Sequence, residues 1–149
     1  MKLIENVKGT KGELHIVLRD EAGNVTQEVT VPNLVVTTGL NYIASRMKDA
    51  TATAMTHMGV GAGTVDPVAG DTALGTALGA RVALTSTTVT ANAVEYVASF
   101  AAGSGTGAVT EAGIFNALTS GTMLCRTEFA VINKGASDSM TITWTVTVS

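Results

Sequence analysis

The most constraining feature of the sequence is an uninterrupted alternation of apolar and hydroxyl side chains over residues 140–149. The apolar members of the run are Met140, Ile142, Trp144, Val146 and Val148. Successive side chains of a β-strand point to opposite faces, so this run has one apolar face and one hydroxyl face. Such a strand is typical of an antiparallel sheet with a core on one side. The run therefore predicts a β protein in which Trp144 packs into the core.

Shorter runs of the same kind predict further strands, separated by turn-forming residues at intervals of roughly 8–12 residues. The predicted strands are residues 13–20, 25–31, 55–61, 81–90, 93–101, 109–115, 122–132 and 139–148. Pro32 is expected to end the second of them, because proline cannot donate to a ladder. The pattern predicts an all-β fold, a jelly-roll-like antiparallel β-sandwich of about eight strands. A closed barrel and an open Greek-key sandwich are the alternatives.

One short α-helix is predicted over residues 38–48, where the spacing of apolar side chains changes to that of a helix. The apolar positions are Leu40, Ile43, Ala44 and Met47. Thr38 is a suitable N-terminal cap, and Arg46 and Lys48 place positive charge in the last turn. This helix is expected to close one end of the β core.

The chain is expected to form a single β-sandwich domain over residues 13–149, preceded by an extended N-terminal arm over residues 1–12. Glycines interrupt the arm and break any regular pattern. A long loop rich in Gly, Ala, Asp and Pro follows Gly61, with one helical turn expected at residues 71–78. Loops of this length inside a compact domain commonly bind a partner or lie on a neighbour.

The composition favours a protein that is partly covered by other proteins. Only 14% of the residues are charged, against roughly 25% in typical soluble domains. A solvated surface rich in threonine and serine explains the same composition equally well. The net charge is −3 and Lys and Arg form no run, which argues against nucleic acid as a partner. The sequence lacks an apolar stretch long enough to span a membrane, so no membrane partner is expected.

The sequence predicts no catalytic residue, no cofactor and no metal. His15 and His57 lie in separate predicted strands and lack other ligands at metal-binding spacing. Asp66 and Asp71 supply two carboxylates in a glycine-rich loop, whereas calcium requires six to eight oxygen ligands. Cys125 lies in an alternating run, where a buried and unreactive thiol is expected.

Glu111 is the most unusual acidic residue, because the predicted strand around it is otherwise small and apolar. Its carboxylate is expected either on the exposed face of the strand or in an ion pair. Arg81 and Arg126 are the candidate partners. A buried pair of this kind would help to specify the strand register.

Several segments together resemble a group of small virion proteins of tailed bacteriophages, the capsid decoration or cement proteins. The resemblance covers roughly residues 14–149 and rests on residues 33–40, 58–63, 70–74, Arg81, 110–116, 121–127 and 142–146. Similar sequences also occur among tail and fibre components. The resemblance implies a homotrimer, made in the host cytoplasm, that binds the major capsid protein on the outer surface of the head and stabilises the shell. The alternative is a tail or fibre module that recognises a host receptor or glycan.

The N-terminal arm is the predicted capsid-binding segment. It combines apolar and basic residues in a stretch too irregular to join the core. The candidate contact residues are Lys2, Leu3, Ile4, Val7 and Lys8.

Overall fold

A computed structural model describes residues 10–48 and 52–148 of the chain. These residues form nine strands and one helix, so the predicted all-β fold with a single short helix is confirmed. The strands are β1 (Lys11–Arg19), β2 (Val25–Val35), β3 (His57–Gly61), β4 (Val82–Ala83), β5 (Ser86–Thr90), β6 (Ala93–Phe100), β7 (Gly107–Phe115), β8 (Met123–Lys134) and β9 (Ser139–Thr147). The helix, α1 (Thr37–Arg46), follows β2.

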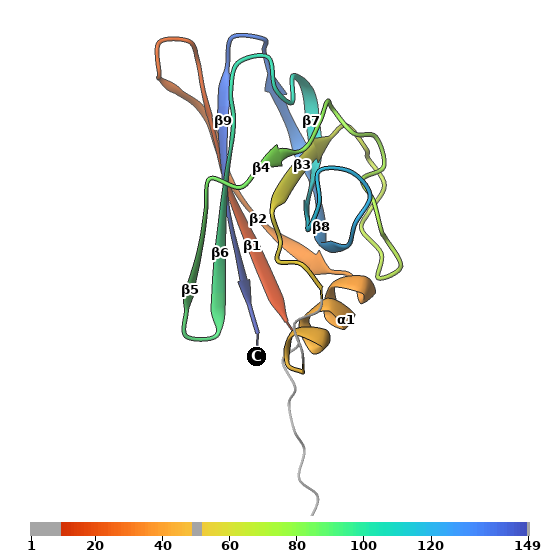
Figure 1. Cartoon of the computed structure of the whole chain (residues 1–149). Helices are drawn as coiled ribbons and strands as arrows, with labels where there is room; N and C mark the ends of the chain where they lie inside the picture. Colours follow the sequence, from red (N-terminus) through yellow and green to blue (C-terminus); the bar gives the residue numbers. More distant parts are fainter. Residues whose placement is uncertain (1–9, 49–51, 149) are drawn as a thin grey trace, which may run out of the picture.

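The strands form one antiparallel sheet in the order β4-β3-β7-β8-β2-β1-β9-β6-β5. The sheet curls, so that the layer of β1, β9, β6 and β5 faces the layer of β3, β7 and β8 (Figure 1). β2 connects the two layers, because most of its length pairs with β1 whereas Leu34 and Val35 pair with β8. The pairs β1–β9, β2–β8, β3–β7 and β5–β6 are nested along the chain, as in a rolled-up hairpin of the jelly-roll kind.

Most strand limits lie within two residues of the prediction, but two strand predictions were wrong by more than that. The segment 81–90 forms two strands: at Leu84 and Thr85 the chain passes from one layer to the other, where the Leu84 N–H donates to Thr56 O and the Thr85 N–H donates to Val97 O. Pro32 does not end β2. At Pro32 one edge of β2 carries no ladder, because β8 pairs with β2 only from Leu34 on, and proline is tolerated at such an edge.

The core lies between the two layers and is built by alternate residues of the strands. Trp144 and Ile142 in β9 and Leu14 and Ile16 in β1 are fully buried, as the alternation predicts. Their register pairs Leu14 with Trp144 and Ile16 with Ile142, so large side chains of the two strands meet directly. Cys125 is also buried in this core, as expected.

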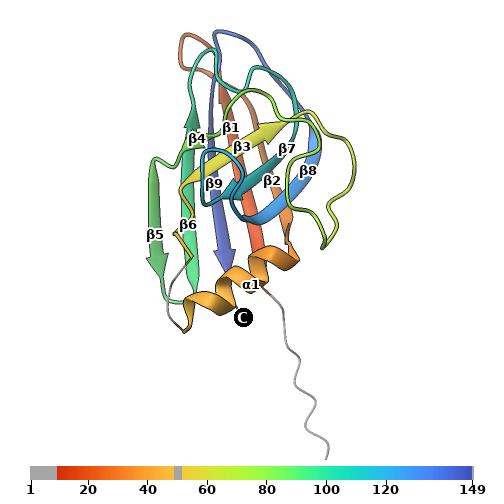
Figure 2. The ribbon, with the colours of Figure 1, turned by 45° about the vertical axis from the view of Figure 1, so that its right-hand side comes forward.

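The helix α1 crosses the lower end of the two layers (Figure 2), but its core-facing residues differ from the prediction. Leu40 and Met47 are 46% and 83% exposed. The buried residue is Gly39, where an added Cβ would lie 2.0 Å from the Leu124 carbonyl oxygen. This glycine lets the helix backbone lie directly on β8. Thr38 does not cap the helix, since its hydroxyl donates to Met123 O.

The structure also changes the limits of two other predicted segments. β1 begins at Lys11, so the last two residues of the predicted arm belong to the sheet. Thr10 precedes the strand, and residues 1–9 of the predicted arm lie outside the described residues. Residues 71–78 contain no helical turn and follow an irregular course instead.

Candidate functional site

The loop between β3 and β4, residues 62–81, covers the outer side of β3 and β7 and is called the covering loop below. Every residue of β7 from Val109 to Phe115 is buried, on both faces of the strand. The loop begins and ends on β3: the Leu78 N–H donates to Val60 O, and Gly61 forms a bridge with Ala77. A sheet face that would otherwise meet solvent is therefore enclosed by a third layer.

A buried ion-pair network anchors the covering loop to the sheet. The Arg126 guanidinium donates to the Glu111 carboxylate from Nε at 3.0 Å and from Nη2 at 2.8 Å. Its Nη1 donates to Asp71 Oδ2 at 2.8 Å, and Nη2 also donates to Val65 O at 3.0 Å. The side chains of Glu111 and Arg126 are 0% and 3% exposed. One arginine of β8 thus joins β7 to two points of the loop.

Glu111 makes the complementary contacts from β7. Its carboxylate accepts backbone N–H groups from Gly63 at 3.0 Å, Gly75 at 2.9 Å and Thr76 at 2.7 Å. A Cβ at Gly63 would lie 2.5 Å from Glu111 Oε1, so the glycine allows the loop backbone to reach the carboxylate. The buried charge is fully hydrogen-bonded, as a stable buried carboxylate requires.

The surroundings of Glu111 keep it ionised. Burial alone raises the pKa of this carboxyl, but the N–H groups of Thr76, Gly75 and Gly63 and the Arg126 guanidinium outweigh that effect. The net result is a pKa of Glu111 below its ordinary value. Burial lowers the pKa of Arg126, but Glu111 and Asp71 raise it by more. The pKa of Arg126 therefore lies above its ordinary value, and the guanidinium stays charged.

The structure brings together two of the three residues predicted for the ion pair. Glu111 pairs with Arg126, whereas Arg81 lies elsewhere and the predicted pairing of Glu111 with Arg81 is wrong. Arg81 Nη1 donates to Ala117 O at 2.8 Å and to Ser120 O at 2.7 Å. Its guanidinium carbon lies 3.4 Å from the centre of the Phe115 ring, a cation–π contact. Arg81, the last residue of the covering loop, therefore contacts the turn after β7 and not Glu111.

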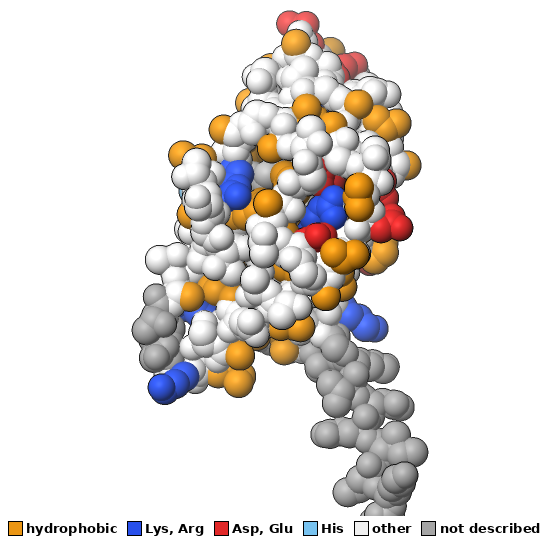
Figure 3. Space-filling view, turned by 90° about the vertical axis from the view of Figure 1, so that its right-hand side faces the viewer, with side chains coloured by type: hydrophobic (Ala, Val, Ile, Leu, Met, Phe, Trp, Pro, Cys, Tyr) orange, Lys and Arg blue, Asp and Glu red, His pale blue; other side chains and the backbone are white. Residues whose placement is uncertain are grey.

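Apolar side chains surround the network on the outside of the molecule. Val65 and Val68, in the covering loop, are 72% and 57% exposed, and Leu34 is 36% exposed. Leu34 pairs with Arg126 across β2 and β8, so its side chain lies on the same outer face. These three residues are called the loop face below. Figure 3 views this side of the molecule and shows hydrophobic side chains around a central group of basic and acidic atoms.

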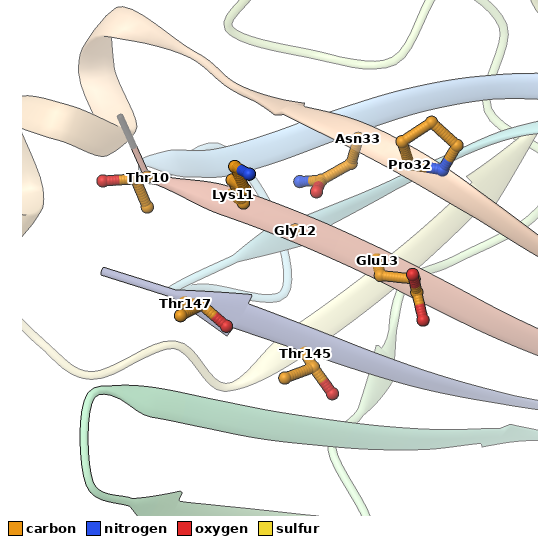
Figure 4. Close-up of a pocket in the computed structure, with 8 residues that line it drawn as sticks. All are labelled: Thr10, Lys11, Gly12, Glu13, Pro32, Asn33, Thr145 and Thr147. Carbon is orange, nitrogen blue, oxygen red and sulfur yellow. The ribbon is translucent and has the colours of Figure 1, made fainter. Parts of the chain in front are cut away.

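Two concave surfaces lie at the end of the sheet where β1 begins. One is a shallow hollow of about 570 Å³ lined by Thr10, Lys11, Gly12, Glu13, Pro32, Asn33, Thr145 and Thr147 (Figure 4). The other, called the α1–β5 groove below, has a volume of about 330 Å³. It is lined by Tyr42, Ile43, Arg46, Ala54, Met55, Thr87, Val89, Val94, Tyr96, Leu124, Val146 and Val148. The hollow presents hydroxyl groups, whereas the groove is mainly apolar.

The residues considered for other chemistry are dispersed. His15 contacts Glu28 at 2.6 Å on the surface of the β1–β2 pair, and His57 contacts the hydroxyl of Thr56. Asp71 belongs to the Arg126 network. In the part of the chain that the structure describes, no group of three His, Cys, Asp or Glu side chains could hold a metal ion. Over the same residues, no helix is long and apolar enough to cross a membrane.

Sequence reasoning missed Lys134, which is 2% exposed at the end of β8. Its Nζ donates to the backbone oxygens of Ala101 at 3.0 Å and Asp138 at 2.8 Å. Burial lowers the pKa of Lys134. The ammonium group ties together two turns at the upper end of the sheet. The position of Lys134, at the end of a mainly apolar segment and directly before Gly135, could have indicated it.

The predicted capsid-binding residues, Lys2 to Lys8, lie outside the described residues, so the structure does not place them. Comparison of the chain with models of protein families, with curated proteins and with solved structures found no match.

Proposed function

We propose that this chain is a structural protein of tailed-phage virions, a capsid decoration protein that binds the outer surface of the head as a homotrimer. The observation that carries this proposal is the convergence of the segments that resemble that family. Residues 58–63, 70–74, 110–116 and 121–127 meet in the covering loop and the strands beneath it. Four of the segments that carry the resemblance therefore belong to one three-dimensional unit, built around Glu111 and Arg126, whereas residues 142–146 lie in β9 of the other layer.

The physical character of this unit supports a role in protein contact. The network fixes the covering loop to the sheet, so the loop face is presented by a rigid support. Its exposed valines and leucine suit contact with another protein. A pre-organised surface loses little conformational entropy on binding.

Such a contact would stabilise a shell by burying apolar surface across the boundary between neighbouring capsid subunits. A contact of about 1,000 Å² contributes a gross hydrophobic term of about 25 kcal/mol. Association entropy and polar desolvation offset most of it. Many trimers on one shell would still act together, because the contacts of each trimer reinforce one another.

Two surfaces are candidates for the contact with the major capsid protein: the N-terminal arm, as the sequence predicts, and the loop face. The variant Val65→Asp/Val68→Asp places two charges on the loop face, and Val25→Asp, at a 47% exposed position of the β1–β2 hairpin, is the matched control. Co-sedimentation with empty shells should be lost for the first variant and kept for the second. Equal binding of both variants would exclude the loop face.

The competing function is receptor or glycan recognition by a tail or fibre component. The specific feature that favours it is the hollow in Figure 4, because the hydroxyls of Thr10, Thr145 and Thr147 are suitable partners for a sugar. Electron microscopy of virions that carry this chain distinguishes the two functions. Density on the outside of the head supports the decoration protein, and density on the tail supports the alternative.

A further inference from the structure

β5 is an edge strand without the usual protection against pairing with another chain. All its residues are exposed, and among the described residues it pairs with β6 alone. Natural edge strands are commonly shielded by charges, prolines or bulges. β5 has none of these: its sequence is Ser-Thr-Thr-Val-Thr, and its register with β6 is unbroken. Its free edge can therefore accept a further strand.

The α1–β5 groove lies beside this free edge and opens into the main core. Figure 1 shows β5 and α1 on opposite sides of the lower end of the molecule. Residues of the core, including Met55, Tyr96 and Leu124, line the groove. Val89 on β5 and Val148 after β9 are 70% and 44% exposed at its rim. An extended segment laid along β5 would cover these side chains and complete the core.

β1 begins at the same end of the domain as the groove. Lys11 pairs with Thr147 in the β1–β9 register, which places Thr10 beside Val148, a residue that lines the groove. Residues 1–9 contain three aliphatic side chains, Leu3, Ile4 and Val7, among polar ones. In an extended strand Leu3 and Val7 point to the same face.

The length of this segment favours the groove of a neighbouring copy over the groove of its own domain. β5 is three strands away from β1 in the sheet, a distance of about 14 Å at the usual strand spacing. Nine extended residues span about 30 Å. Crossing that distance takes about four extended residues, the ones nearest Thr10, so Val7 of the same copy could not pair along its own β5. A segment from a second copy can place both Leu3 and Val7.

We propose that residues 1–9 of one copy pair with β5 of a second copy and fill its α1–β5 groove. A contact of this kind joins two different surfaces, so three copies related by a threefold axis close into a ring. The inference deepens the proposed function and rests on the homotrimer that is part of it. It assigns the segment to the neighbouring copy and leaves the shell contact to the loop face.

Light scattering of the purified chain at micromolar concentration tests this assignment without any shell. The full chain and the control Val25→Asp should have the mass of a trimer. Deletion of residues 1–9 and the variant Val89→Asp should each reduce the mass threefold, to that of a folded monomer. Circular dichroism verifies that both variants are folded. Val89→Asp is expected to fold because the Val89 side chain is 70% exposed. Trimers in both variants would overturn the inference, and so would a monomeric full chain.

Cysteine cross-linking identifies which copy supplies the segment. In Leu3→Cys/Val89→Cys, oxidation should give covalent dimers and trimers on a denaturing gel, whereas each single variant should give no trimer. Cys125 is buried and should not interfere. Cross-linked monomers alone would place the segment in its own groove and overturn the inference. A trimer that persists without residues 1–9 but no longer binds shells would also overturn it, while leaving the proposed function intact.

Discussion

In β9 alternate residues are buried, whereas in β3 and β7 nearly every residue is buried. The layer of β1, β9 and β6 therefore has an apolar inner face and a mainly polar outer face, which in β9 carries hydroxyl groups. The layer of β3, β7 and β8 has an apolar inner face and a second buried face beneath the covering loop. On that second face lie Glu111 and Arg126, the buried ion pair.

This difference shows two ways of stabilising a sheet. One layer depends on the burial of apolar area, which has no directional requirement and little pH dependence. The other must also enclose backbone and charged groups, and each buried polar group needs a partner. The glycines of the covering loop, the carboxylate of Glu111 and the guanidinium of Arg126 meet that requirement together. Changes in the two layers should therefore have different consequences.

The largest expected effect is in the covered layer. Arg126→Met removes the cation and leaves the Glu111 carboxylate buried, which should lower the free energy of unfolding by about 3–5 kcal/mol. Urea denaturation at neutral pH measures the loss. The control is Asp71→Asn, at a partly exposed side chain, with an expected loss of about 1 kcal/mol or less. Similar losses for the two variants would show that the buried pair is not the main anchor.

A comparable but slightly smaller effect is expected in the regular layer. Ile142 is fully buried, and Ile142→Ala should cost about 2–5 kcal/mol through lost apolar burial and a residual cavity. Unlike Arg126→Met, this loss should be the same at pH 7 and pH 4. If the loss of unfolding free energy in Ile142→Ala changed strongly between these pH values, the regular layer would not depend on apolar burial alone.

A smaller effect is expected from pH alone. The pKa of Glu111 is lowered from its ordinary 4.5 in the folded protein, so the ionised carboxylate stabilises the fold. That contribution is fully present above about pH 4.5 and declines as the pH falls through the lowered pKa. Between pH 5 and pH 3 the free energy of unfolding of the wild type should therefore fall more than that of Glu111→Gln. If the free energy of unfolding fell equally in the wild type and in Glu111→Gln, the ionised Glu111 carboxylate would not be the source of the pH dependence.

The smallest effect is expected on the hydroxyl face of β9. Thr143 is half-buried there, and Thr143→Val keeps the β-branched shape. The free energy of unfolding should change by about 0.5 kcal/mol or less. A much larger loss in thermal denaturation would show that this face is covered by another copy of the protein.

The regular layer could be predicted from the sequence because strand alternation is a local property. Ile142, Trp144 and Val146 follow it, and the structure buries all three. The covered layer could be predicted only in part. The sequence indicated Glu111 and offered Arg126 as a partner, but Asp71 and the N–H groups of the loop come from distant segments. Local pattern carries no information on such contacts.

The errors in the fold have the same cause. The helix face was predicted from Leu40, Ile43, Ala44 and Met47; Ile43 packs against the core, Leu40 and Met47 do not, and the closest contact with β8 is made by Gly39. The division of residues 81–90 into β4 and β5 depends on which layer each half meets, and both halves have suitable strand residues. In each case a tertiary contact decided between locally acceptable structures.

Both the comparison of the layers and the proposed function depend on a rigid covering loop. Amide hydrogen exchange of Gly63, Gly75 and Thr76 tests this most directly, because their N–H groups donate to Glu111. These amides should exchange as slowly as those of β7 in the wild type and much faster in Arg126→Met. Rapid exchange in the wild type, as in an ordinary surface loop, would contradict the account.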